Sequence, residues 1–155
     1  MGMSSSTYVN PVLTAISDWN SLVNSSNDGS GTDFYFTRVY SSSGATISFW
    51  GENQPSEEWR GLTKLYDSSG NLLYKIGTPS YTTSDWTRAS IIFNTSNAPT
   101  GNSTYMRSIA NHEIGHAIGL DHVSNPYAVM MQGYLSRYAF TPSYHEKKGA
   151  EVIYP

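Results

Sequence analysis

The sequence predicts an α+β fold, with helices packed against a twisted mixed sheet of about five strands. Apolar residues recur at helical spacing over residues 10–23 and again over residues 102–120. Between them, from residue 33 to residue 96, short runs of β-branched and aromatic residues are separated by turn-forming residues. A chain of 155 residues suffices for one domain with a buried core. We therefore expect a single domain over residues 1–155, with residues 1–6 as a disordered or added start.

The first predicted helix, residues 10–23, begins at Asn10-Pro11. Asparagine is a good helix cap, and proline suits the first helical turn. The apolar positions that follow are spaced so that they share one face of a helix. They are Val12, Leu13, Ile16, Trp19 and Val23. We expect an amphipathic helix that buries this face.

The strands are predicted from β-branched and aromatic content over suitable lengths. The segments are 33–40, 45–50, 62–66, 72–77 and 88–96. DSSGN, residues 67–71, joins the third segment to the fourth and is a turn signal. These two segments are therefore expected to form a hairpin.

Two more helices are predicted toward the C-terminus. In residues 102–120 the polar Asn102 can cap the helix, and Gly119 can end it by taking a positive φ. Residues 143–153 can form a third helix despite Gly149. Helix, several strands and two helices in succession favour an α+β arrangement.

The composition excludes several classes of function. The net charge is −3 and no basic stripe occurs, so neither nucleic acid nor an anionic membrane surface is an expected partner. Cysteine is absent, which excludes disulfides, a thiol nucleophile and cysteine metal ligands. No apolar run is long enough for a membrane span. The opening MGMSSSTYVN lacks the regions of a signal peptide, and we expect a trimmed start from a longer precursor.

Three of the four histidines lie in the stretch NHEIGHAIGLDHVSNPYAVMM, residues 111–131. His112 and His116 are four residues apart, so on a helix they project from one face and can bind the same ion. Glu113 lies about 100° around the helix from His112, which puts its carboxylate beside the ion rather than on it. The sequence therefore predicts two metal ligands and a base.

A catalytic zinc ion needs a third protein ligand and an open position for water. His122 is the expected third ligand, because a positive φ at Gly119 would end the helix and turn the chain back toward the metal. The alternative is a downstream glutamate, Glu146 or Glu151, as thermolysin-like enzymes use. His145 stands alone in a polar segment and is expected to be solvated. One zinc ion is therefore predicted.

The pattern His112-Glu113-x-x-His116-x-x-Gly119-x-x-His122 resembles the long zinc motif of the metzincin metallopeptidases. Within that class the stretch is similar to the matrixins, in which a turn methionine lies eight residues after the third histidine, as Met130 does here. Astacins and serralysins carry a tyrosine two residues after that methionine, where this chain has Gln132. The resemblance is good from about Ala45 onward.

The matrixin resemblance implies further features. It places Met130 beneath the metal without ligating it, and Tyr134 on the wall of the pocket for the side chain after the cleaved bond. It also suggests that Leu72, Leu73 and Tyr74 form an edge strand that pairs with substrate, since a free strand edge can bind an extended peptide. Calcium could bind at Asp67–Asn71, although the same residues read equally well as a turn.

Together these features predict a secreted, monomeric zinc endopeptidase that binds proteins or peptides in extended form. Glu113 is expected to take a proton from the attacking water and to pass it to the departing amine. The alternative is a non-catalytic zinc-containing binding or adhesion module on the same fold. An intact Glu113 argues against that alternative, because losing this residue is the simplest way to make such a module inert.

Overall fold

The computed structural model describes residues 6–23, 35–39, 42–75, 85–99, 101–133 and 136–154, without the side chains of Ser6, Ser42, Tyr74 and Lys75. Its elements are α1 (Ser6–Val23), the short 3-10 helix η1 (Ser42–Gly44), β1 (Ile47–Glu52), β2 (Gly61–Tyr66), β3 (Leu72–Lys75), β4 (Arg88–Asn94), α2 (Ser103–Ala117) and α3 (Tyr144–Ile153). The predicted α+β class is confirmed.

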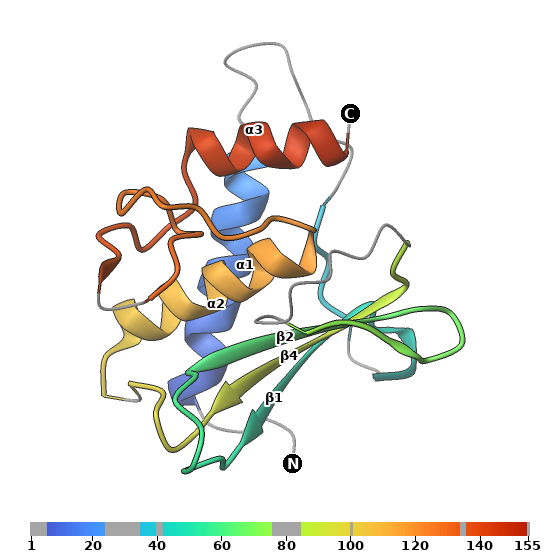
Figure 1. Ribbon diagram of the computed structural model, residues 1–155, viewed down its shortest axis with the longest axis horizontal. Coiled ribbons are helices and arrows are strands. Elements are labelled where there is room, and N and C mark those ends of the chain that lie inside the picture. Colours follow the sequence, from blue (N-terminus) through green and yellow to red (C-terminus); the bar gives the residue numbers. More distant parts are fainter. Residues whose placement is uncertain are drawn as a thin grey trace.

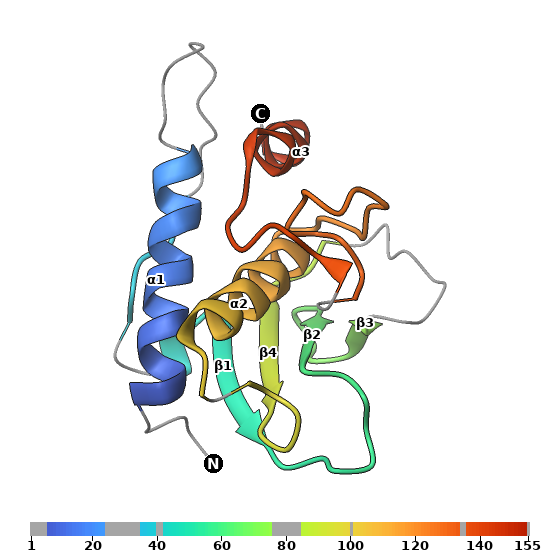
Figure 2. The ribbon, with the colours of Figure 1, turned by 90° about the vertical axis from the view of Figure 1, so that its left-hand side faces the viewer.

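The sheet is mixed and has the strand order β1-β4-β2-β3 among the described residues. β1 and β4 are parallel, whereas β2 is antiparallel to both of its neighbours, β4 and β3. α2 contacts α1 on one side and β2 and β4 on the other. Figure 1 and Figure 2 accordingly show α2 lying between α1 and the sheet. This central helix carries the first part of the histidine motif.

The sheet has four strands over the described residues rather than about five. The missing strand is the one predicted at 33–40, of which residues 35–39 are described and are not in a strand. Instead, the Asn20 side chain accepts from the Phe36 N–H and donates to the Phe36 carbonyl, both at 2.9 Å. A side chain of α1 thus satisfies backbone groups that a neighbouring strand would otherwise pair.

The predicted helices are present, with differences at their ends. α1 begins at Ser6, which the sequence had assigned to a disordered or added start, so Pro11 lies inside the helix rather than in its first turn. Asn102 caps α2 by accepting hydrogen bonds from the N–H groups of Thr104 and Tyr105. α3 opens with a capping box in which Ser143 and Glu146 satisfy each other's backbone N–H groups.

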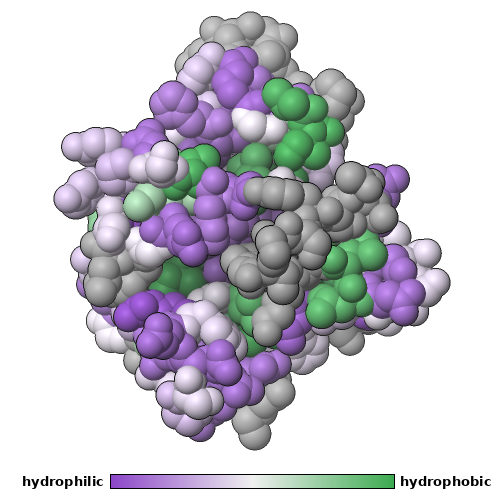
Figure 3. All heavy atoms as spheres, viewed as in Figure 1, coloured by the Kyte–Doolittle hydropathy of each residue, from purple (hydrophilic) through white to green (hydrophobic). Residues whose placement is uncertain are grey.

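The core lies between α1, α2 and the sheet. Its largest fully buried side chains include Trp19, Ile91, Phe93, Met106 and Ile114. The face shown in Figure 3 is largely hydrophilic, with hydrophobic side chains in separate patches. No helix among the described residues is long and apolar enough to cross a membrane.

Asn94, at the end of β4, anchors the loop that leads into β2. Its buried side chain donates to the Gln54 carbonyl at 2.7 Å and accepts from the Gln54 N–H at 3.1 Å. The same amide also donates to the carbonyls of Glu57 and Trp59. These bonds hold the start of β2, which lies against the candidate site.

Candidate metal and active site

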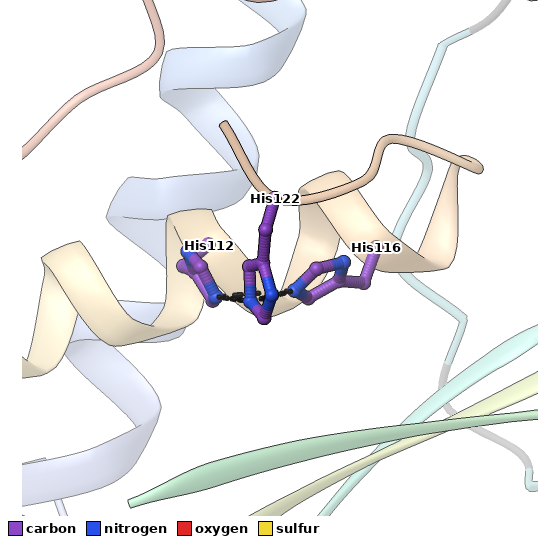
Figure 4. A group of neighbouring side chains, drawn as sticks. All are labelled: His112, His116 and His122. Atoms are coloured by element: carbon purple, nitrogen blue, oxygen red, sulfur yellow. Dashed lines mark hydrogen bonds between the residues drawn. The ribbon is translucent and has the colours of Figure 1, made fainter. Parts of the chain in front are cut away.

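Three histidines converge on one point between α2 and the chain that follows it. The Nε2 atoms of His112, His116 and His122 lie 3.1 to 3.2 Å from one another. Figure 4 shows the imidazoles of His112 and His116 projecting from one face of α2 and that of His122 reaching the same point from the turn. The structure thus brings together the three predicted ligands, which could hold a metal ion.

The hydrogen bonds on the far side of two rings leave their Nε2 atoms free to bind a metal. Nδ1 of His112 lies 2.8 Å from the Val129 carbonyl, and Nδ1 of His116 lies 2.8 Å from the Leu120 carbonyl. A carbonyl can only accept, so the proton must be on Nδ1 and the Nε2 lone pair is available. The close Nε2 contacts between these two rings therefore contain no proton, and a cation between them would remove the lone-pair repulsion.

The spacing and charge state of the donors fit zinc. A tetrahedral zinc ion at about 2.0 to 2.1 Å from each nitrogen would separate the nitrogens by about 3.3 Å, close to the distances found. Burial lowers the pKa of His116 to about 4 and that of His112 well below its usual range. Burial also lowers the pKa of His122. All three are therefore neutral near pH 7, which is the form that binds metals.

Gly119 makes the turn that returns His122 to the site. It has φ of +93°, as predicted. The Leu120 N–H donates to the Gly115 carbonyl and the Gly119 N–H to the His116 carbonyl, which is the bonding pattern of a Schellman motif. The same turn brings the Leu120 carbonyl onto His116 Nδ1. One helix end therefore both orients the second histidine and redirects the chain toward the third.

Met130 is 2% exposed and packs against α2 directly beneath the histidine motif. A Cβ added at Gly115 would lie 2.3 Å from its sulfur, so only glycine leaves room for this contact. The Met130 carbonyl accepts from the Val123 N–H at 3.1 Å, and its own N–H faces Glu146 Oε1 at 3.4 Å. The isolated glycine inside a helical pattern was the sequence signal for this packing.

Glu113 is 3% exposed, and its side chain rests against β2 rather than solvent. Thr63 Oγ1 donates to Oε2 at 2.7 Å and also lies 3.0 Å from the Glu113 carbonyl. A Cβ at Gly61 would lie 2.6 Å from Oε1. Burial raises the pKa of Glu113 to about 7, against the opposing effects of Thr63 and Arg137. Nothing in the sequence pattern had indicated Thr63 or Gly61.

Arg137 is a further buried charge beside the site. It is 5% exposed, and its Nη1 donates at 2.8 Å to the Val129 carbonyl that also faces His112 Nδ1. The sequence analysis did not identify Arg137, although it is the only Lys, Arg, Asp or Glu residue between His122 and His145. An isolated arginine in a stretch without carboxylates was the available signal.

The other predicted ligands lie elsewhere. Glu146 accepts from Ser143 at the start of α3, and Glu151 pairs with Lys147 and Lys148. Among the described residues, neither glutamate is part of a group that could hold a metal. His145 is exposed, as expected.

The predicted substrate-binding residues are only partly visible. Leu72, Leu73 and Tyr74 lie in β3, the outer strand of the described sheet. Leu72 pairs with Tyr66 and Tyr74 with Leu65 of β2, while Leu73 lies at an irregularity between these two pairs. Tyr134 lies outside the described residues. Within DSSGN the Asp67 carboxylate accepts hydrogen bonds from the backbone N–H groups of Ser69 and Asn71 and from the Asn71 side chain. The loop is therefore a turn held by its own hydrogen bonds.

An α+β fold with two histidines on a central helix, a third after a glycine turn and a methionine beneath them defines the metzincin class of zinc metallopeptidases. The chain belongs to the matrixin family, because the family model for the matrixins (peptidase M10) matches residues 6–155. Matrixins are zinc-dependent metalloendopeptidases. A comparison with curated proteins found no match.

Proposed function

We propose that this chain is a zinc-dependent endopeptidase that hydrolyses peptide bonds of protein substrates. His112, His116 and His122 hold one catalytic zinc ion, and Glu113 is the general base and general acid. The observation that carries the proposal is the convergence of three Nε2 atoms at 3.1 to 3.2 Å, next to a buried carboxylate. Membership of the matrixin family supports the same reaction.

When bound, zinc would polarise the peptide carbonyl and acidify a coordinated water. Glu113 takes the proton of the attacking water and later gives it to the departing amine. A pKa of about 7 suits both transfers, because the carboxyl group can take up and release a proton near neutral pH. Thr63 holds one carboxylate oxygen, so the side chain keeps one orientation through both steps.

We also propose that substrates bind in extended form along the open side of the sheet. Leu72, Leu73 and Tyr74 of β3, together with Tyr134, are the substrate contacts that the matrixin resemblance implies. We add the residues Gly61–Thr63 of β2 to this set, because Gly61 packs against Glu113 and Thr63 forms a hydrogen bond with it. β3 pairs only with the other half of β2, residues Lys64–Tyr66. We further propose that the chain is secreted, as matrixins typically are, and that it acts as a monomer.

The decisive experiment is Glu113→Gln with zinc and cleavage measured on the same sample. The variant should retain about one equivalent of zinc and lose cleavage of casein or gelatin, because an amide cannot accept the proton. Native protein should lose cleavage with a chelator and regain it with added zinc. Normal cleavage by Glu113→Gln would disprove the assigned base. No chelator-sensitive cleavage by the native chain would favour a zinc-containing binding module.

A further inference from the structure

Arg137 is a buried charge beside the candidate metal centre that forms no ion pair with any residue the structure describes. Its guanidinium has five N–H donors, yet the described residues accept only one bond from it, at the Val129 carbonyl. Nε is buried and has no hydrogen-bond partner. No described carboxylate lies within ion-pair distance of it. Among the described residues, a side chain that is 5% exposed thus has one hydrogen-bond acceptor and one buried N–H group without a partner.

Arg107, which is partly exposed, shows how another arginine of the same chain is accommodated. It forms two hydrogen bonds with Asp18, from Nε to Oδ2 at 2.7 Å and from Nη2 to Oδ1 at 2.5 Å. This fork-to-fork contact matches the planar guanidinium to a carboxylate. Arg137 is more deeply buried than Arg107 and lacks such a partner. The comparison of the two arginines indicates that the partner that would complete the hydrogen bonding of Arg137 is a carboxylate.

The charge on Arg137 persists at neutral pH. Burial lowers its pKa, but only to about 10, and attraction to Glu113 opposes the shift. A buried charge without a close partner is costly in free energy. Such sites are often functional, because the missing partner can be a ligand.

The position of Arg137 ties it to the reacting centre. The Val129 carbonyl accepts a hydrogen bond from Arg137 Nη1 and another from His112 Nδ1. One carbonyl group therefore links the guanidinium to a proposed metal ligand. Among the described residues, Glu113 is the acidic group whose charge attracts it, and a bound zinc ion would add further positive charge. The positive charge beside His112 therefore favours the binding of an anion there.

We propose that Arg137 is a specificity-determining residue that binds the carboxylate of an aspartate or glutamate next to the cleaved peptide bond. The inference rests on the proposed peptidase function and names its preferred substrate class. The acidic side chain enters beside His112 and supplies the acceptor that Arg107 obtains from Asp18. Uncharged glutamine has the same shape but offers a weaker, neutral acceptor.

Cleavage of matched peptides tests this preference. Two peptide series carry glutamate, glutamine or lysine at the residue before or after the cleaved bond. In one series kcat/KM for the native chain should be about 10- to 100-fold higher with glutamate than with glutamine, the range for hydrogen bonds to charged groups. Arg137→Met should bring that ratio to about one, and Arg137→Lys should keep part of it. Arg88→Met, which removes an exposed arginine on β4, should leave the ratio as in the native chain.

A purely structural role for Arg137 gives a different result. Loss of its bond to Val129 would then lower kcat/KM for all peptides by the same factor and leave the glutamate-to-glutamine ratio unchanged. An unchanged ratio in Arg137→Met, or a native ratio near one in both series, would overturn the proposal.

Peptide binding separates this inference from the proposed function. Zinc-loaded Glu113→Gln should bind the glutamate peptide about 10-fold or more tightly than the glutamine peptide. Adding Arg137→Met should remove the difference. If the native chain cleaves nothing but this difference is found, the peptidase function fails and the role of Arg137 stands. If the native chain cleaves both peptides equally and Glu113→Gln binds both equally, the role of Arg137 fails and the peptidase function stands.

Discussion

The two sides of the candidate site are built in different ways. The metal side comes from one short stretch, residues 112–122, in which two histidines share a helix face and a Schellman turn returns the third. The side that holds Glu113 depends on distant residues: Thr63 and Gly61 lie in β2, and Arg137 lies beyond the methionine turn. Local geometry thus supplies the proposed ligands, while tertiary contacts set the orientation and charge of the proposed base.

The largest effect is expected on the metal side, from His122→Ala. Removing one of three ligands should weaken zinc binding by at least about 100-fold. Even substitution of a residue that hydrogen-bonds a metal ligand typically lowers metal affinity by about 10- to 100-fold. Zinc content after dialysis against a weak chelator measures this. His145→Ala is the matched control, because that histidine is exposed and away from the cluster. Full zinc retention by His122→Ala would mean that another residue is the third ligand.

Thr63→Val should have the next largest effect, on the Glu113 side. It removes a hydrogen bond to a buried carboxylate, worth about 1.5 to 3 kcal/mol, which corresponds to about a 10- to 100-fold fall in kcat. Zinc content should change little, because the hydrogen bonds of the Thr63 hydroxyl go to Glu113 and not to the histidines. Thr63→Ser keeps the hydroxyl and should restore most of kcat. Equal losses in both variants would show that the hydroxyl by itself does not account for the effect.

Gly115→Ala tests the packing that supports the metal side from below. The added Cβ would clash with the Met130 sulfur, and overpacking of this kind costs about 1 to 3 kcal/mol. For a domain of this size we expect Tm to fall by about 2 to 10 °C. Gly101→Ala is the control, since nothing lies within 4 Å of its added Cβ. Equal Tm values for the two variants would contradict a close contact between Met130 and α2.

The smallest effect is expected from Glu151→Gln, far from both sides of the site. Glu151 lies 2.7 Å from the partly exposed Lys148 and 3.7 Å from Lys147. Lys148 is exposed, so its ion pair with Glu151 contributes about 0 to 1 kcal/mol. Lys147 is buried, but the amide of the variant still offers it an oxygen acceptor, so the total loss of stability should be about 1 kcal/mol. Zinc content should be unchanged. Zinc loss in this variant would revive the glutamate-ligand alternative.

The difference between local geometry and long-range contacts also explains which predictions from the sequence are confirmed. The amphipathic helix, the capped α2, the turn at Gly119 and the histidine cluster all follow from spacings of a few residues, and the structure contains them. The strand predicted at 33–40 is absent from residues 35–39, because Asn20 bonds to Phe36. Strand pairing is a long-range choice that β-propensity alone does not decide.

By itself, the sequence determined the positions of the proposed ligands and of the proposed base, because helical periodicity and one positive φ place residues 112–122 with little help from the rest of the chain. It also determined the class of fold through the order of its helical and strand-forming segments. Only the tertiary structure decided that Thr63 holds Glu113 and that Arg137 is buried with no carboxylate of the described residues paired to it. Those contacts join residues separated by 50 positions or by an irregular segment, and burial strengthens their charges by excluding water.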